Sequence, residues 1–361
     1  MRRLAPLVAA TVLALIAVLG ALPAASHDAA SRDFDQLHLD LAVEPDLERG
    51  RVTGHATLRF QALVEGLRTL RLHCVDTRVL AVVGEDAEPL TWSLKDGILR
   101  IDLAAALPAG RGSLVKVAYR STPRRGLYFH RPTKRHPDTP LLMYSQGQSN
   151  DNRRWIPCYD LPDDRFALDL RVTVPAELKT VSNGRLVDRK ESDDGRRTDH
   201  WQFEDETPSY LVSLIVGDLE TITDRWEDTL LEYTAVPGHA EELKTALGET
   251  PAMLDYFSGL LDAPYPWDRY AQTFVWDFIY GGMENVTATT LNMRALHLPS
   301  ARPNYTSEGL VAHELAHMWF GDLITCRTWD DIWLNEGFAT YLTDLWFDHA
   351  YGRDAFLLRR R

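Results

Sequence analysis

The apolar pattern of the chain changes its period near residue 225, and this change limits the fold more than any other feature of the sequence. Up to that point, short runs such as residues 55–63 and 112–120 alternate apolar and polar side chains between Gly, Pro and Asp, which is typical of half-buried strands. Beyond it, residues 307–321 and 335–352 carry apolar side chains at helical spacing. We therefore expect a β-rich part followed by a helical part.

The β-rich part is predicted to be an antiparallel β-sandwich domain over residues 27–224, and a mainly helical domain follows over residues 225–361. The length agrees with this division, because 361 residues are enough for two separate cores. The composition is that of a soluble globular chain, with 45% apolar and 25% charged residues.

Turn residues predict several boundaries within these domains. The Asp96-Gly97 pair predicts a two-residue hairpin, and Pro251 predicts the start or the break of a helix. Gly321 and Gly352 follow helical patterns, and we expect them to end those helices.

Residues 1–26 have the three-part composition of a secretory signal peptide. Arg2 and Arg3 precede a nearly unbroken apolar run, and small residues follow it, with the best cleavage site after Ser26. The alternative is an uncleaved membrane anchor, since the run approaches the length of a bilayer span. We expect an exported protein, periplasmic or extracellular, that associates with the membrane only if this segment stays uncleaved.

The net charge and the cysteine content argue against a nucleic-acid-binding protein and against a protein built on disulfides or a thiolate metal site. The net charge of −13 argues against nucleic-acid binding, which normally needs a basic face. The three cysteines, Cys74, Cys158 and Cys326, can form at most one disulfide, and none has the C-x-x-C spacing of a thiolate metal site. We expect no nucleic-acid partner, and we interpret the cysteines as structural.

A histidine pair is the strongest chemical signal. His313 and His317 are four residues apart, with Glu314 directly after the first. On a helix this spacing puts both imidazoles on one face, where they can bind one Zn²⁺ while the glutamate acts on a water molecule. The motif alone is moderately weak, because two partly buried, hydrogen-bonded helix histidines would give the same letters.

A third ligand strengthens the prediction. A catalytic zinc usually takes three protein ligands, and a third histidine in the pattern H-E-x-x-H-x-x-G-x-x-H is excluded because Phe320 and Leu323 occupy those places. Glu336 follows His317 after eighteen intervening residues, which is enough to end one helix and begin a second that faces it. The expected site is His₂Glu with one Zn²⁺ per chain, and its expected chemistry is peptide-bond hydrolysis by a zinc-activated water with Glu314 as general base.

A glycine pair upstream suggests how a substrate is held. Gly281 and Gly282 allow a backbone strand to approach an extended peptide closely. Glu284 could then meet a positive charge at the end of that peptide. An ordinary glycine-rich turn with a surface glutamate is the alternative interpretation.

Taken together, GGMEN (281–285), HELAH (313–317) and the spacing to Glu336 resemble the zinc aminopeptidases of the aminopeptidase N and leukotriene hydrolase family. Residues 144–175 also resemble that family's substrate-anchoring glutamine stretch. The resemblance implies that a thermolysin-like catalytic domain follows the β-sandwich domain. It also implies cleavage of the N-terminal peptide bond of oligopeptides that have a free amine.

The resemblance assigns a role to each matching residue. It implies that His313, His317 and Glu336 bind zinc, and that Glu314 is the base. The residues that it implies hold the substrate are Gln146, Gln148, Gly281, Gly282, Met283 and Glu284, of which Glu284 binds the α-amine with help from the two glutamines.

Two features depart from the family pattern. Gln148 stands where many members carry Glu, so amine recognition depends more on Glu284. The family also stabilises the oxyanion with a tyrosine far downstream of the third ligand, whereas here 25 residues follow Glu336, and we interpret Tyr341 and Tyr351 as helix-packing residues. The chain is therefore expected to hold an incomplete catalytic domain, and because an oxyanion donor contributes roughly 10²–10³ in rate, weak activity is expected from it alone.

Two other functions stay open at this point. The same site could hydrolyse an epoxide or another non-peptide substrate. Alternatively, the chain could be a non-catalytic, truncated remnant that binds peptides.

Overall fold

The computed structural model describes residues 32–360. The predicted signal peptide, residues 1–26, lies outside the described residues, so its cleavage and the expected export stay predictions. Within residues 32–360, no helix has the length and apolar character needed to cross a bilayer.

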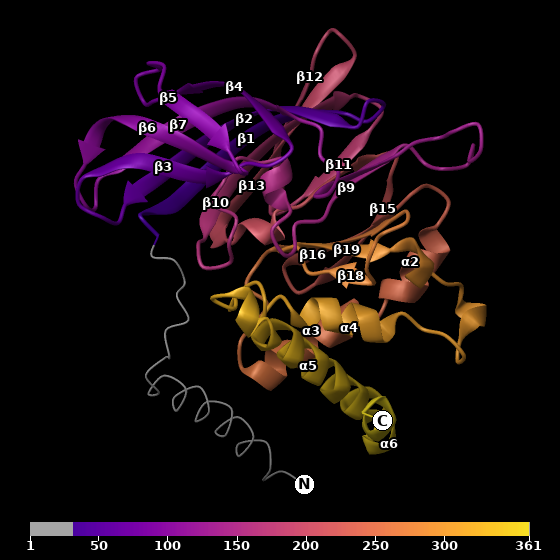
Figure 1. The fold of residues 1–361 in the computed structure, drawn as a ribbon. Coiled ribbons are helices and arrows are strands. Elements are labelled where there is room, and N and C mark those ends of the chain that lie inside the picture. The colour runs from indigo at the N-terminus through magenta and orange to yellow at the C-terminus, as the bar shows by residue number, and fades with distance from the viewer. Residues whose placement is uncertain (1–31, 361) are drawn as a thin grey trace, which may run out of the picture.

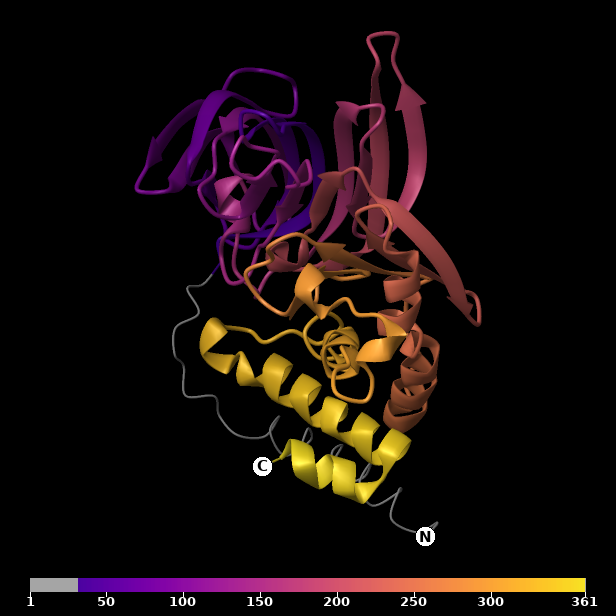
Figure 2. The same ribbon diagram turned by 90° about the vertical axis from the view of Figure 1, so that its right-hand side faces the viewer.

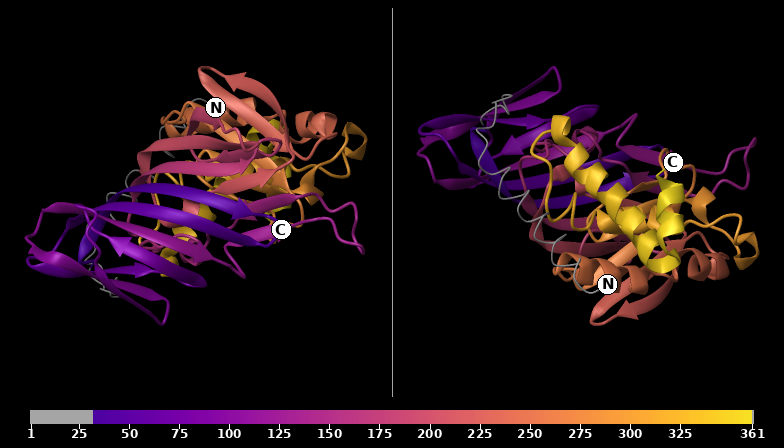
Figure 3. Two further views of the ribbon diagram at one scale, coloured as in Figure 1. Left: turned by 90° about the horizontal axis from the view of Figure 1, so that it is seen from above. Right: turned by 90° about the horizontal axis from the view of Figure 1, so that it is seen from below.

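The first part of the chain is built almost entirely from strands. They form a seven-stranded, a three-stranded and a four-stranded sheet, stacked above the rest of the molecule in Figure 1 and seen from above in Figure 3. The seven-stranded sheet has the order β12 (Arg185–Glu191), β13 (Arg196–Thr207), β10 (Phe166–Pro175), β1 (Phe34–Asp46), β2 (Arg51–Ala62), β7 (Gly112–Ser121), β4 (Thr77–Val83). The three-stranded sheet has the order β3 (Leu67–His73), β6 (Ile98–Leu107), β5 (Thr91–Lys95). The four-stranded sheet has the order β11 (Lys179–Ser182), β14 (Leu214–Gly217), β9 (Leu142–Ser145), β8 (Leu127–His130).

Period-two alternation explains these strands. Every second residue of β10 is buried, from Phe166 to Val174, and β2 alternates in the same way from Val52 to Ala62, so the seven-stranded sheet places one apolar face on the core. The predicted β-rich fold is confirmed. Among the described strands of these three sheets, β1 and β10 are the exception to antiparallel pairing, because they run parallel.

The predicted hairpin at Asp96-Gly97 is also confirmed. The pair joins β5 to β6 with φ angles of 52° and 76°. A two-residue turn with both central residues at positive φ matches the right-handed twist of the strands that it connects.

The second part begins with a sheet, of which the sequence analysis anticipated only the strand at Gly281 and Gly282. Its order is β15 (Glu220–Trp226), β16 (Thr229–Ala235), β17 (Arg269–Val275), β19 (Ala288–Asn292), β18 (Gly282–Met283). Three of these strands, β16, β17 and β19, run parallel. The predicted domain boundary between residues 224 and 225 falls inside β15 and stays a prediction.

Helices cover the lower face of this sheet. They are α2 (Ala240–Leu247), α3 (Thr250–Leu261), α4 (Glu308–Ala316), α5 (Trp333–Tyr351) and α6 (Arg353–Arg359). Figures 1 and 2 both place α4 between the sheet and α5. The sheet therefore separates two cores: Ala271 and Val275 of β17 pack with the N-terminal sheets, whereas Tyr270 and Phe274 pack with the helices.

Two helix boundaries agree with the sequence and one does not. Pro251 lies in the first turn of α3, and Gly352, with φ of 86°, follows the last residue of α5. The predicted end of α4 at Gly321 is wrong, because the helix ends at Ala316. Longer turns follow it, in which the amide of Asp322 donates to the carbonyl of His317.

A carboxylate on the seven-stranded sheet generates a stability prediction. Asp169 on β10 accepts hydrogen bonds from His38 on β1 and His200 on β13, and so connects three strands. Burial alone would raise the pKa of Asp169, but the bonds from the two histidines outweigh it and hold this pKa below its usual value. A depressed pKa stabilises the fold above the unfolded pKa of about 3.9, and this contribution is lost as the pH falls through the folded value.

Asp169→Asn is therefore expected to lower the free energy of unfolding by about 1–2 kcal/mol at pH 7, since a charged hydrogen-bond acceptor is lost. The difference from wild type should shrink below about pH 4. Urea unfolding at pH 7 and pH 3.5 measures both, with Asp188→Asn, an exposed carboxylate paired with Lys190, as the control. Equal unfolding midpoints for wild type and Asp169→Asn at pH 7 would contradict the prediction.

Candidate metal centre

The three predicted ligands lie together. His313 lies on α4, His317 directly follows it, and Glu336 lies in the first turn of α5. The Nε2 atoms of the two histidines are 3.1 Å apart. Oε2 of Glu336 lies 3.3 Å from Nε2 of His313 and 3.6 Å from Nε2 of His317. All three donor atoms lie within 4.8 Å of one another, and among the described residues this is the one cluster of His, Cys, Asp or Glu that meets this criterion.

Local sequence explains this convergence. One turn of helix separates the two histidines, while Val311 and Leu315 hold α4 against the second core. The helix α5 packs against α4, and Figure 2 shows it crossing below α4. Because α5 begins at Trp333, its first turn brings Glu336 to the histidine pair.

The donor set fits a zinc ion. Ligands about 2.0–2.1 Å from tetrahedral zinc are about 3.3 Å from one another, close to the spacing found here. Nδ1 of His317 is 2.9 Å from the carbonyl oxygen of Phe320, and a proton donated there leaves the Nε2 lone pair free for a metal. The side chain of Glu336 remains 44% exposed, so one side of the cluster faces open space.

Burial and mutual proximity shift the pKa values of the charged groups. Burial raises the pKa of Glu314 to about 8, with help from Glu284 and Glu336 and against the attraction of His317. Burial would lower the pKa of His317, but Glu284, a hydrogen bond to Glu336 and Glu314 together raise it to about 10. Hydrogen bonds from His313 and His317 hold the pKa of Glu336 well below its usual range. The raised pKa of His317 shows that the surrounding carboxylates favour a positive charge at this place.

The strand β18 passes over Glu314. A Cβ atom added to Gly282 would lie 2.3 Å from Oε1 of Glu314, and one added to Gly281 would lie 3.2 Å from the side chain of Leu310. Glycine is therefore needed at position 282 for this close approach, whereas a side chain at 281 would meet only the end of Leu310. Because β18 is the last strand of its sheet, the edge that does not face β19 has no partner strand among the described residues.

Two further predicted residues have free acceptor atoms in this region. Glu284 and Gln146 are both buried, and within residues 32–360 neither Oε1 of Glu284 nor Oε1 of Gln146 has a hydrogen-bond partner. Nε2 of Gln146 contacts the sulfur of Met283 at 3.2 Å, which fixes the direction of the amide. Gln148 is half-buried two residues further along the same loop, and its side chain makes no hydrogen bond to another described residue.

The packing role predicted for the last two tyrosines fits Tyr351, whose ring contacts Phe347 on the same helix, better than it fits Tyr341. Tyr341 and Tyr351 are 42% and 55% exposed. Both lie on α5 outside the core that holds Leu342 and Trp346. Tyr351 makes an aromatic contact with Phe347, with 5.5 Å between ring centroids, and its hydroxyl donates to Glu308.

Sequence analysis also missed residues that support the site from the N-terminal part. Tyr210 contacts Asn335 and Gly321 through its hydroxyl. Arg165 donates to the carbonyl of Asp322 and to the hydroxyl of Thr325. No local sequence pattern predicts these contacts. A buried tyrosine and an arginine directly before a strand are the only signals that the sequence offers.

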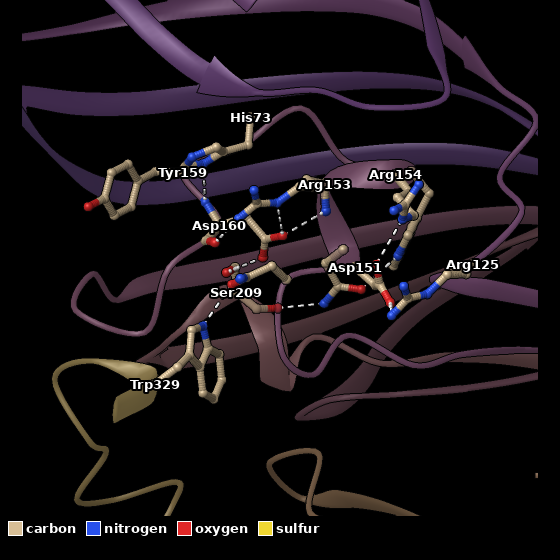
Figure 4. A network of polar contacts seen from close by, with 12 residues as sticks. His73, Arg125, Asp151, Arg153, Arg154, Tyr159, Asp160, Ser209 and Trp329 are labelled. Atoms are coloured by element: carbon tan, nitrogen blue, oxygen red, sulfur yellow. Dashed lines mark hydrogen bonds and ion pairs between the residues drawn. The ribbon is translucent and has the colours of Figure 1, made fainter. Parts of the chain in front are cut away.

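A polar network holds the loop that carries Gln146 (Figure 4). Buried Asp160 accepts hydrogen bonds from Arg153 and from the hydroxyl of Ser209. Trp329, from the segment before α5, approaches this network and donates to Asn150 at 2.7 Å. The loop that carries Gln146 and the segment that leads into α5 are therefore tied to the same framework.

The sequence matches two families of known domains. It matches the Peptidase M1 N-terminal domain over residues 35–211 and the Peptidase family M1 domain over residues 245–360. The first match covers the N-terminal sheets except β14, and the second contains all three predicted ligands.

Curated relatives agree with these matches. Probable aminopeptidase 1 of Sulfurisphaera tokodaii is 34% identical over 211 residues, which cover 57% of this chain and 26% of that protein. Leukotriene A-4 hydrolase of Xenopus laevis is 30% identical over 350 residues, which cover 91% of this chain and 54% of that protein. The chain thus spans about a quarter to about half of the length of these relatives.

A solved structure has the same fold. It is the crystal structure of a mutant M1 zinc metallopeptidase from Deinococcus radiodurans bound to a Tyr-Ser-Ala substrate. It matches with a TM-score of 0.74 and 27% identity, over 90% of this chain and 73% of that chain. Both domain matches, the relatives and this structure point to one family, and the chain belongs to peptidase family M1.

Proposed function

We propose that this chain carries the metal site and the amine-binding site of a zinc aminopeptidase that hydrolyses the N-terminal peptide bond of oligopeptides. The observation that carries the proposal is the convergence of His313, His317 and Glu336 beside two buried glutamates, Glu314 and Glu284. When bound there, Zn²⁺ would supply Lewis-acid chemistry, because it polarises a carbonyl group and makes water a stronger acid.

Glu314 is proposed to move the proton. Its carboxylate is buried next to the predicted ligands, and its pKa is raised to about 8, first of all by burial. A carboxylate held at this place beside the metal ligands can accept a proton from attacking water and later give it to the leaving amine. The close approach of Gly282 restricts where the Glu314 side chain can lie and so orients it.

Glu284 and Gln146 are proposed to bind the substrate amine. Each has a buried acceptor oxygen without a partner among the described residues, and an unpaired buried acceptor is costly until it receives a donor. A primary ammonium group carries several N–H donors and a positive charge, so it suits both oxygens. An amine held at a fixed distance from the metal restricts cleavage to the first peptide bond.

The edge of β18 is proposed to align the peptide backbone. An extended peptide can add to an exposed strand edge through main-chain hydrogen bonds. Gly281, Gly282 and Met283 lie at or next to this edge. The alignment explains how one site could accept many sequences, because main-chain bonds do not depend on side chains.

Glu314→Gln is expected to lower kcat for an aminoacyl-p-nitroanilide by about 10²–10⁴, the usual contribution of a positioned proton carrier. The bound zinc should remain, since Glu314 is not a proposed ligand. Activity assays with metal analysis measure both, and Glu241→Gln, an exposed glutamate on α2, is the control. Full activity of Glu314→Gln would overturn the proposed role.

Glu284→Gln is expected to lower kcat/KM about 10- to 100-fold, because a charged hydrogen bond to the amine contributes about 1.5–3 kcal/mol. Acetylating the substrate amine removes the same interaction, so wild type should lose a similar factor on the acetylated substrate. The variant should then lose little more. Equal losses on both substrates would instead mean that Glu284 serves the chemical step, and efficient cleavage of the acetylated substrate would favour a different hydrolase.

Removing the metal is expected to lower both activity and thermal stability. Ligand binding to the native state stabilises it by about 2.7 kcal/mol when the free metal is 100 times its Kd. His317→Ala should abolish the zinc-dependent rise in Tm, and His136→Ala, an exposed loop histidine, should keep it. A wild-type Tm that does not respond to zinc or to a chelator would contradict the metal site, and zinc binding with no turnover would favour the peptide-binding alternative.

A further inference from the structure

Tyr210 reaches from the N-terminal part into the junction between the two ligand-bearing helices. It lies in the short turn η2 (Ser209–Leu211) and is 1% exposed. Its phenol ring meets Trp329 edge-on, with 5.1 Å between ring centroids. Trp329 belongs to η5 (Trp329–Asp331), which comes just before α5.

The hydroxyl of Tyr210 bridges two segments that are far apart in sequence. It donates to the carbonyl oxygen of Gly321 at 3.2 Å, and it accepts from Nδ2 of Asn335 at 3.1 Å. Gly321 lies four residues after His317, and Asn335 lies directly before Glu336. The hydroxyl oxygen of Tyr210 therefore connects the segment that follows His317 with the segment that directly precedes Glu336.

Asn335 extends this bridge. Its side-chain oxygen accepts from the backbone N–H of Cys326 at 3.0 Å, and Asn335 is completely buried. Both ends of this amide are thus occupied, which fixes its rotamer and the first turn of α5. Among the described residues, Nδ2 has Tyr210 as its only partner, whereas the carbonyl of Gly321 also accepts from Thr325. Loss of the Tyr210 hydroxyl would therefore affect Asn335 most.

We propose that Tyr210 is a positioning residue that sets the distance between the histidine pair and Glu336, and thereby the affinity of the site for its metal. This inference rests on the proposed function in one respect, namely that His313, His317 and Glu336 bind zinc. It assigns part of the metal affinity to the N-terminal domain, which supplies none of these ligands.

Tyr210 is itself held firmly enough for this role. Asn152 donates to the carbonyl oxygens of Ser209 and Val212, on either side of Tyr210. The carbonyl of Tyr210 also lies so close to Gly147 that a Cβ atom there would be 2.5 Å away. The turn therefore packs directly on the Gln146–Gln148 loop, and these contacts fix the position of the Tyr210 backbone.

A second tether limits what the loss of this hydroxyl would do. Arg165 donates to the carbonyl of Asp322 at 2.7 Å and to the hydroxyl of Thr325 at 2.7 Å. The segment after α4 therefore stays attached to the N-terminal domain when Tyr210 loses its oxygen. The expected result is a protein that folds but whose Glu336 is less well placed.

Tyr210→Phe is expected to weaken zinc binding about tenfold, the lower end of the range for outer partners of metal ligands. Competition with a chromophoric chelator measures the affinity. The absorption spectrum of the Co²⁺-substituted protein reports ligand geometry directly and should change in band position or intensity. Tyr119→Phe is the matched control, since that buried hydroxyl has no hydrogen-bond partner among the described residues.

A second variant separates positioning from general stability. Asn335→Ala removes the other half of the bridge, so Tyr210→Phe combined with Asn335→Ala should bind zinc no more weakly than Asn335→Ala alone. Thermal unfolding of the metal-free proteins accompanies these measurements. If Tyr210→Phe lowers only the metal-free Tm, with wild-type zinc affinity and Co²⁺ spectrum, its role is structural and the inference is wrong.

The outcomes distinguish the two proposals. If the wild-type chain fails to bind zinc, the proposed function fails. If the wild type binds zinc and Tyr210→Phe binds it equally well with the same Co²⁺ spectrum, the proposed function stands and the positioning role of Tyr210 is overturned.

Discussion

A concentration of buried carboxylates is the constraint on which the second half of the molecule depends. Glu284, Glu314 and Asp322 are all nearly inaccessible, and burial raises the pKa of each one. Such groups destabilise a fold unless a cation, a proton or hydrogen-bond donors neutralise them. Within the described residues, neither carboxylate oxygen of Asp322 has a hydrogen-bond partner. A bound cation would relieve part of this repulsion, so folding and metal binding are expected to be coupled.

The N-terminal domain is hydrogen-bonded to the segments that carry the predicted site residues. Asn183 donates both to Leu211, beside Tyr210, and to Val286, which follows the GGMEN segment. Together with Arg165 and Tyr210, Asn183 connects the N-terminal sheets both to the GGMEN segment and to the segment that follows α4. The two domains therefore share a polar interface whose hydrogen bonds would all be lost if they separated.

The sequence predicted the parts of the site that follow from short-range geometry. His313 and His317 meet because a helix repeats every 3.6 residues, and the spacing to Glu336 left room for one turn between two helices. Apart from the strand at Gly281 and Gly282, the sheet β15–β19 escaped detection because β17 is buried at every position, so it lacks the alternation that marks a half-exposed strand. The bridge from Tyr210 to Asn335 also escaped, because it joins segments 125 residues apart and no periodicity spans that distance. The roles assigned to the site residues stay predictions.

The parallel pair in the largest sheet has a consequence for folding. The strand β1 pairs with β10, so that His38 lies opposite Ala167. More than a hundred residues separate β2 from β10 along the chain, so β1 and β2 can pair well before the strand that completes the middle of their sheet joins them. Contacts of such long sequence separation slow folding, so the early strands spend that interval with an unpaired edge, open to other extended chains.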